Sequence, residues 1–238
     1  TFDPNANGPI LSLTNVDTSR VGTYTVVVTT TAGSATSDPA TLTLSSTPTR
    51  VANISTRGVT AGGNQALIAG FVVANAPGAP PNQTRQMLIR VIGPSLNGPP
   101  LNLNVAGALN NPVLEVYNSA GVPILTNDNW GIQSTNAAAS ATQVTAIQQA
   151  TTRVGTFALA PNSQDAVVFA TLPAGNYTVQ GYGANPGASG VVLIEVYDAT
   201  VAATTATSPR ASNVATRGEV GTGANVLIAG FVINGTAS

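Results

Sequence analysis

The feature that most constrains the fold is a stretch that the chain contains twice. Residues 50–73 read RVANISTRGVTAGGNQALIAGFVV, and residues 210–233 read RASNVATRGEVGTGANVLIAGFVI. The two align without a gap at an offset of 160, and 12 of the 24 aligned positions are identical, including the run LIAGFV. A match at a fixed spacing indicates a repeated structural unit. The sequence therefore predicts one whole repeat followed by the first strands of another.

The composition favours many short strands and excludes several kinds of chemistry. Thr, Ala, Val, Asn and Gly dominate, which is typical of strands joined by polar turns. Only 7% of the residues are charged, and the chain has no Lys, His or Cys. A Ser-His-Asp triad, a thiolate nucleophile, a His-based metal site and a Schiff-base lysine are therefore excluded. A net charge of −1 gives no basis for nucleic-acid binding, and no apolar run approaches the ~18 residues of a membrane span. We expect no enzyme activity, no cofactor and no membrane insertion.

The segment between the two copies predicts strands and one short helix. Apolar patterns predict strands at about 51–56, 66–74, 86–92, 113–118, 123–126, 155–160, 165–172, 176–182 and 190–198. The only helical candidate is 134–150, with Ser134 as N-cap. Its apolar face follows a spacing of three to four residues through Ala137, Ala141, Val144 and Ile147.

Residues 10–44 predict the last strands of a different sandwich, beginning with Leu11 and Leu13. The sequence DTSRVGTY at 17–24 resembles the tyrosine corner of immunoglobulin-like domains. The run GNYTV at 175–179 echoes GTYTV at 22–26, so we expect a comparable corner at both places. An immunoglobulin-like domain needs about 100 residues. The strands that would cover this sheet are therefore not within the segment.

Several motifs together resemble a repeat domain found beside immunoglobulin-like domains in very large secreted or surface proteins of environmental bacteria. They are STRG, LIAGFV, LIRVIGPSL, NDNWG, VGTFAL, LPAGNYTVQ and VLIEVYD. The layout also resembles jelly-roll and pre-peptidase C-terminal β-sandwiches. The resemblance implies an extracellular stalk or array module without established chemistry. The predicted organisation is the C-terminal part of an immunoglobulin-like domain at 1–46, a complete all-β sandwich repeat at 50–200, a linker at 201–209 and the first strands of the next repeat at 210–238.

The best candidate for a ligand site is the turn NDNWG at 127–131. Its oxygen-bearing side chains and the sole tryptophan suit Ca²⁺ or a sugar ring, with Asp128 and Trp130 as the ligand residues. The alternative is a structural turn in which Trp130 packs on the sandwich.

Two further pairs of charged residues have a functional and a structural interpretation. Glu115 and Glu195, on the similar strands LEVYN and IEVYD, could form the carboxylate pair of a glycosidase. Alternatively, each could meet an arginine such as Arg90 or simply face water. Arg57 and Arg217 recur in the motif TRG and could clamp an anion, or could bond to carbonyls or an acid at the domain junction.

The strand at 226–233 is apolar on both faces, which makes a poor free edge and a good insert. We expect it to join subunits head to tail into a filament by strand addition, through Leu227, Ile228, Phe231, Val232 and Ile233. The missing strands could equally lie in sequence beyond the two ends. Truncation at Ala211 is then expected to leave 50–200 folded but unable to assemble. The hypothesis is a structural module of an extracellular cell-surface or filament-forming repeat protein, and the alternative is a polysaccharide- or cell-surface-binding module.

Overall fold

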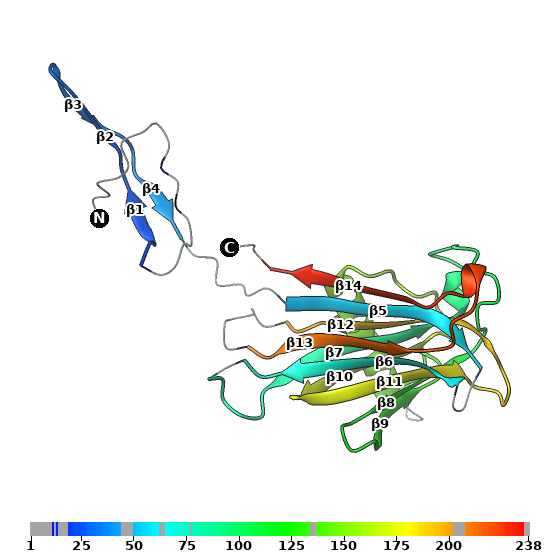
Figure 1. Cartoon of the computed structure of the whole chain (residues 1–238). Coiled ribbons are helices and arrows are strands. Elements are labelled where there is room, and N and C mark those ends of the chain that lie inside the picture. Colours follow the sequence, from blue (N-terminus) through cyan, green and yellow to red (C-terminus); the bar gives the residue numbers. More distant parts are fainter. Residues whose placement is uncertain are drawn as a thin grey trace.

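The described residues form a sandwich of two five-stranded antiparallel sheets, preceded by two small two-stranded sheets (Figure 1). The computed structural model describes residues 11, 13, 19–43, 50–61, 65–76, 78–133, 137–201 and 208–235. The all-β sandwich with one short helix predicted from the sequence is confirmed.

Each sheet combines strands that are far apart in the sequence. The elements are β1 (Gly22–Tyr24), β2 (Val27–Thr30), β3 (Gly33–Thr36), β4 (Ala40–Leu42), β5 (Arg50–Thr60), β6 (Leu67–Ala74), β7 (Thr84–Ile92), β8 (Pro112–Tyr117), β9 (Pro123–Asn127), α1 (Ala137–Val154), β10 (Ala166–Pro173), β11 (Gly175–Gly183), β12 (Gly190–Asp198), β13 (Arg210–Arg217) and β14 (Ile228–Asn234). The first sheet has the order β10-β7-β12-β5-β14, and the second has the order β13-β6-β11-β8-β9.

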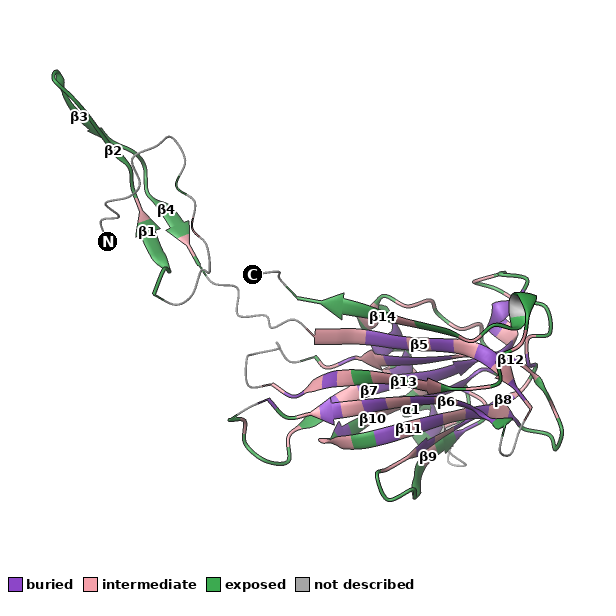
Figure 2. Ribbon diagram, in the orientation of Figure 1, coloured by how far each residue is buried: buried purple, intermediate pink, exposed green. Residues whose placement is uncertain are grey.

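The main core lies between the two sheets (Figure 2). Burial alternates along β6 and β8, because successive side chains of a strand point to opposite faces of its sheet. The largest buried side chains of this core include Ile54, Leu67, Phe71, Ile89, Leu114 and Ile194. By contrast β7 is buried on both faces, because α1 and the chain around Leu96 cover the outer side of the first sheet.

The helix packs on the first sheet with a face that differs by one position from the predicted one. Val144 and Ile147 pack against the sheet as expected, but Ala141 is exposed. The first turn instead turns Ser140 inward, where its hydroxyl accepts a hydrogen bond from the backbone N–H of Gln133 at 2.9 Å. The predicted N-cap, Ser134, lies outside the described residues.

The strand predicted at 155–160 is wrong, because this segment closes the helix and then crosses the outer face of the first sheet. Gly155 has a φ of 70°, and the N–H groups of Gly155 and Thr156 donate to the carbonyls of Thr152 and Thr151. This is the hydrogen-bond pattern of a glycine-terminated helix. The carbonyl of Phe157 then accepts a hydrogen bond from Arg90 at 2.7 Å, rather than pairing with a neighbouring strand.

The N-terminal strands form one long hairpin with an interrupted ladder, in which β1 pairs with β4 and β2 pairs with β3, and it projects away from the sandwich in Figure 1. Nearly all of their residues are exposed (Figure 2). Leu11 and Leu13 lie in no strand, and residues 14–18 lie outside the described part.

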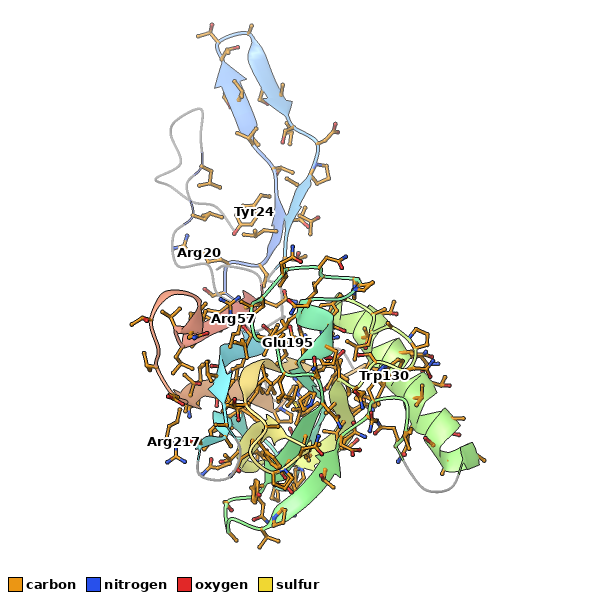
Figure 3. All side chains as sticks on the ribbon, turned by 90° about the vertical axis from the view of Figure 1, so that its right-hand side faces the viewer. Arg20, Tyr24, Arg57, Trp130, Glu195 and Arg217 are labelled. Atoms are coloured by element: carbon orange, nitrogen blue, oxygen red, sulfur yellow. The ribbon has the colours of Figure 1, made fainter. Side chains whose placement is uncertain are left out.

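Both predicted tyrosine corners have their defining hydrogen bond. The hydroxyl of Tyr24 donates to the carbonyl oxygen of Arg20 at 2.5 Å, and Figure 3 shows the two residues close together. The hydroxyl of Tyr177 donates to the carbonyl oxygen of Pro173 at 2.7 Å, again four residues earlier. The two similar sequences therefore build the same local structure in the hairpin and in the sandwich.

Candidate assembly site

The second copy of the repeated stretch adds one edge strand to each sheet of the sandwich. β13 pairs with β6, and β14 pairs with β5, both antiparallel. In the repeat, β13 is the counterpart of β5, and β14 is the counterpart of β6. The second strand pair (β13 and β14) therefore binds the first strand pair (β5 and β6) reciprocally. β13 binds β6, which is the counterpart of β14, and β14 binds β5, which is the counterpart of β13.

The registers of the two ladders show that this junction has a local two-fold axis. One ladder pairs Arg210 with Ala74, Ala211 with Val73, Ala215 with Gly70, Thr216 with Ala69 and Arg217 with Ile68. The other pairs Asn234 with Arg50, Ile233 with Val51, Gly230 with Ser55, Ala229 with Thr56 and Ile228 with Arg57. The offset of 160 converts one set into the other. Each ladder also has one register shift, between Ser212 and Ala215 in the first and between Val232 and Ile233 in the second.

Side chains on the axis meet their own counterparts. The hydroxyl oxygens of Thr56 and Thr216 lie 2.7 Å apart. Each also lies 3.1 Å from a carbonyl oxygen across the junction, Thr56 from that of Ile228 and Thr216 from that of Ile68. The two hydroxyls thus link both ladders at the point where the copies cross.

Glycines allow the two copies to approach closely beside the threonines. A Cβ at Gly58 would lie 2.9 Å from Leu227 and 3.0 Å from Leu67. A Cβ at the counterpart, Gly218, would lie 2.7 Å from Leu67 and 3.3 Å from Leu227. The glycine of the TRG motif therefore makes room for the paired leucines of both copies.

The two strand pairs differ sharply in burial, although their sequences match. Phe71 is 1% exposed, whereas its counterpart Phe231 is 62% exposed. Val73 is 1% exposed, whereas Ile233 is 57% exposed. Figure 2 shows β14 as an exposed strand beside the largely buried strands of the sandwich. Of the five residues predicted to join subunits, Leu227 is half-buried against the core, and Ile228, Phe231, Val232 and Ile233 are exposed.

A polar pocket of about 650 Å³ lies on the outer side of the first sheet, between the end of α1, β12 and β14. Its charged lining residues are Arg50, Arg153, Glu195 and Asp198. The pairs at Asp198 extend the cluster: Arg50 and Arg85 lie 3.6 and 3.4 Å from its carboxylate. Much of the small charge content of the chain is therefore gathered here.

The floor of this pocket is a buried ion pair. Arg90 donates to Glu195 Oε2 through Nε at 2.9 Å and through Nη2 at 2.6 Å, and its guanidinium lies 4.0 Å from the ring centroid of Phe157. The hydroxyl of Tyr197 donates to the other carboxylate oxygen of Glu195 at 2.7 Å. Burial raises the pKa of Tyr197, and the negative charge of Glu195 raises it further.

The possible carboxylate pair of a glycosidase is not formed. Glu195 meets Arg90, as the structural interpretation expects. Glu115 lies in the other sheet, where burial alternates so that it faces outward, and it accepts a hydrogen bond from Tyr117 at 2.5 Å. The two carboxylates therefore lie on opposite outer faces of the sandwich, and no bond between them can be attacked by both.

The turn at 127–131 has its aromatic residue inside and its carboxylate outside. Trp130 is 5% exposed, packs with Ile147 of α1 and donates its ring N–H to the carbonyl of Ala160 at 3.1 Å. Figure 3 places it beside the helix. Asp128 is exposed. This geometry favours a structural turn, and among the described residues no group of three acidic, His or Cys side chains could hold a metal ion.

Arg57 and Arg217 occupy equivalent places with different surroundings. Arg57 is half-buried on the outer face of the first sheet, beside Leu193 and Ile228 in the neighbouring strands. Arg217 pairs only with Ile68, and in Figure 3 it points away from the sandwich. Arg217 lies on an edge strand, β13, which has no strand in the position that β12 occupies beside β5.

Sequence reasoning missed residues that act only through three-dimensional contacts. Thr56 and Thr216 carry a signal in their identity across the repeat, but nothing in the sequence indicates that they touch. Asp165 carries no signal at all, yet it is fully buried and accepts hydrogen bonds from the N–H of Gly93 at 2.8 Å and the hydroxyl of Ser95 at 2.5 Å. It fixes the turn that follows β7.

Comparison with known proteins adds no identification: no family model matches the chain, and no curated protein sequence matches it. In the part of the chain that the structure describes, no helix is long and apolar enough to cross a membrane.

Proposed function

We propose that the chain is a structural module of an extracellular cell-surface or filament-forming repeat protein, whose exposed strands are completed by neighbouring subunits or repeats. The observation that supports this most is β14, which presents Ile228, Phe231, Val232 and Ile233 to solvent at a sheet edge. An exposed apolar edge strand readily pairs with another chain. Contiguous exposed apolar surface also marks sites of protein–protein contact.

Covering this strand would add to the stability of an assembly. Fully burying one large apolar side chain contributes about 1.5–3 kcal/mol. The four side chains are between 43% and 62% exposed, so covering them contributes roughly half of the full amount, about 3–6 kcal/mol before the costs of association. Main-chain hydrogen bonds along the free edges of β13 and β14 add specificity, because they impose a register. A contact of this heterologous kind, repeated head to tail, builds a linear array rather than a closed dimer.

The proposal of a non-catalytic role rests on the chemistry of the side chains present. Without Lys, His or Cys, an active site would have to use carboxylates, tyrosines or hydroxyls. The best-placed carboxylate, Glu195, is held by Arg90 and Tyr197. A carboxylate fixed in this way stabilises the fold and is poorly placed to transfer protons.

The charged pocket supports an alternative function, a binding module for a polysaccharide or another cell surface. Arg153 lines this pocket and offers hydrogen-bond donors for hydroxyl groups, and the ring of Tyr197 also lines it. Saturable glycan binding that is lost in Arg153→Ala, but kept in the surface control Thr142→Ala on α1, would favour this alternative.

Electron microscopy of the native material tests the main proposal. Fibres, stalks or regular surface arrays are expected. Monodisperse particles that carry a saturable glycan-binding activity would contradict the structural role and favour the binding module. As a matched test in solution, the chain with Phe231→Asp should lose any assembly that the unaltered chain shows, because a charge at this exposed position opposes burial without disturbing the sandwich.

A further inference from the structure

We infer that β13 and β14 form a preformed docking face for a second structural unit like the one that residues 75–200 form. We call residues 75–200 the first body and the unit that would occupy the face the second body. The second body would be joined to β14 as the first body is joined to β6. Both sheets would then continue without a break from one repeat into the next. This inference rests on the proposed function as a repeat module and specifies the partner and its orientation.

The first body shows what such a face requires. β11 covers the free side of β6, and Phe71 stacks on Tyr177 with ring centroids 5.3 Å apart. β12 covers the free side of β5. With these two strands in place, β5 and β6 are internal strands of the two sheets, and their apolar side chains are covered.

The second strand pair has the same residues in the same places without that cover. Phe231 is the counterpart of Phe71, and its ring is exposed where Tyr177 would stack. Asn53, beside Tyr197 of β12, is buried, whereas its counterpart Asn213 is exposed. The unfilled positions are thus those of a β11-like strand beside β14 and a β12-like strand beside β13.

The junction itself already has the symmetry that two bodies would require. The two-fold axis between Thr56 and Thr216 relates the first strand pair to the second, with matched registers in both ladders. A second body placed by this axis would extend the first sheet from β14 through strands equivalent to β11, β8 and β9. It would extend the second sheet from β13 through strands equivalent to β12, β7 and β10.

A second whole copy of this chain does not fit the face equally well. In each folded copy, β11 already pairs with β6 and β8, and β12 already pairs with β5 and β7. Neither strand has a free side to offer. The matching occupant is therefore a body whose β11- and β12-like strands each keep one side free, as in a body that follows β14 in the same polypeptide.

Hydrogen exchange on an extended chain tests this inference. The probe is the full chain to Asn234 with a second copy of its own residues 75–200 joined directly after that residue. We expect the amides of 228–234 to exchange at least about tenfold more slowly than in the unextended chain, because the edge strand becomes internal. The control is the same pair of chains with Phe231→Asp, which should fold in the unextended form and show no added protection in the extended form.

Three results would overturn the inference. The first is an appended segment that is unfolded while 228–234 exchange as before. The second is added protection that persists with Phe231→Asp. The third is an unextended chain that already protects 228–234 by self-association, which would make a second copy the occupant. The first two results concern only the occupant of the face, and the third replaces it with a neighbouring subunit. The proposed function itself is tested separately, on the native assembled material.

Discussion

The hydroxyl oxygens of Thr56 and Thr216 lie 2.7 Å apart, although the two residues are 160 positions apart in the chain. That separation equals the offset of the repeat, so each threonine touches its own counterpart. Only residues close to a two-fold axis can meet their counterparts in this way. The pair therefore marks the axis about which the two copies of the strand pair associate.

The threonine pair should contribute to stability as a unit. Thr56→Val and Thr216→Val should each lower the free energy of unfolding by about 0.5–1.5 kcal/mol. Valine has nearly the shape of threonine, so each substitution removes only the hydrogen-bonding hydroxyl. The double variant should cost less than the sum, because the shared bond can be lost only once. Urea denaturation of the four proteins measures the coupling, and strictly additive losses would contradict a direct bond.

The same substitution should strongly destabilise the chain in the first copy and have almost no effect on stability in the second. Phe71→Ala should destabilise the chain by about 3–5 kcal/mol, because it leaves a cavity beside Tyr177 in the core. Phe231→Ala should change the stability by less than about 0.5 kcal/mol, because its ring is exposed. Thermal and urea unfolding check both. Equal losses would mean that Phe231 is covered in the isolated chain.

The buried ion pair should be sensitive to the loss of one partner. Arg90→Ala should lower the free energy of unfolding by about 3–5 kcal/mol, because Glu195 is left in the interior without its counter-charge. Arg90→Met together with Glu195→Leu should recover much of this loss, since both charges are removed. Urea unfolding tests it, and a double variant less stable than Arg90→Ala would show that the pair does more than neutralise charge.

Stability should fall at alkaline pH because of buried tyrosines. Burial raises the pKa of Tyr197, and burial with a hydrogen bond to Glu115 raises the pKa of Tyr182 to about 12. Above pH about 10 the unfolded chain releases these protons while the folded chain keeps them, so the free energy of unfolding decreases as pH rises. Tyr197→Phe should flatten this decrease between pH 9 and 11.5 when unfolding is followed by fluorescence. An unchanged slope would contradict the assignment.

Removal of the second strand pair should destabilise the sandwich. Truncation after Val201 uncovers one edge of β5 and one edge of β6 and removes Ala211 from the core. We expect a loss of roughly 3 kcal/mol or more, because packing and strand pairing are lost. The repeat alone predicts that 50–200 stays folded after truncation at Ala211. Calorimetry decides this, and an unchanged melting temperature would favour the autonomous unit.

Much of the sandwich follows from sequence patterns, because strand alternation reports directly on a two-layer core. The LIAGFV and LIRVI runs predict β6 and β7, and both are central strands. The helix face was misplaced because a polar residue, Ser140, points inward to a backbone partner. The false strand at 155–160 is an extended segment whose carbonyl at Phe157 bonds to a side chain, Arg90, which no periodicity reveals.

The candidate site was predicted only in part, for a physical reason. The apolar residues of 226–233 are evident in the sequence, and the repeat shows that they match Ala66 to Val73. Two similar strand pairs can associate within one chain or between chains with the same contacts. The pairing of β14 with β5 of the same chain therefore depends on the three-dimensional arrangement, and the local sequence pattern does not predict it.

Hydrogen exchange in the native assembled material tests most directly whether the exposed strand pair is completed by a neighbour. In the isolated chain, the amides of 228–234 should exchange much faster than those of 67–74, the equivalent strand with neighbours on both sides. In the native assembly we expect the two segments to exchange at similar, slow rates. If 228–234 exchanges as fast in the assembly as in the isolated chain, nothing covers β14, and the account of this protein as a module completed by its neighbours is contradicted.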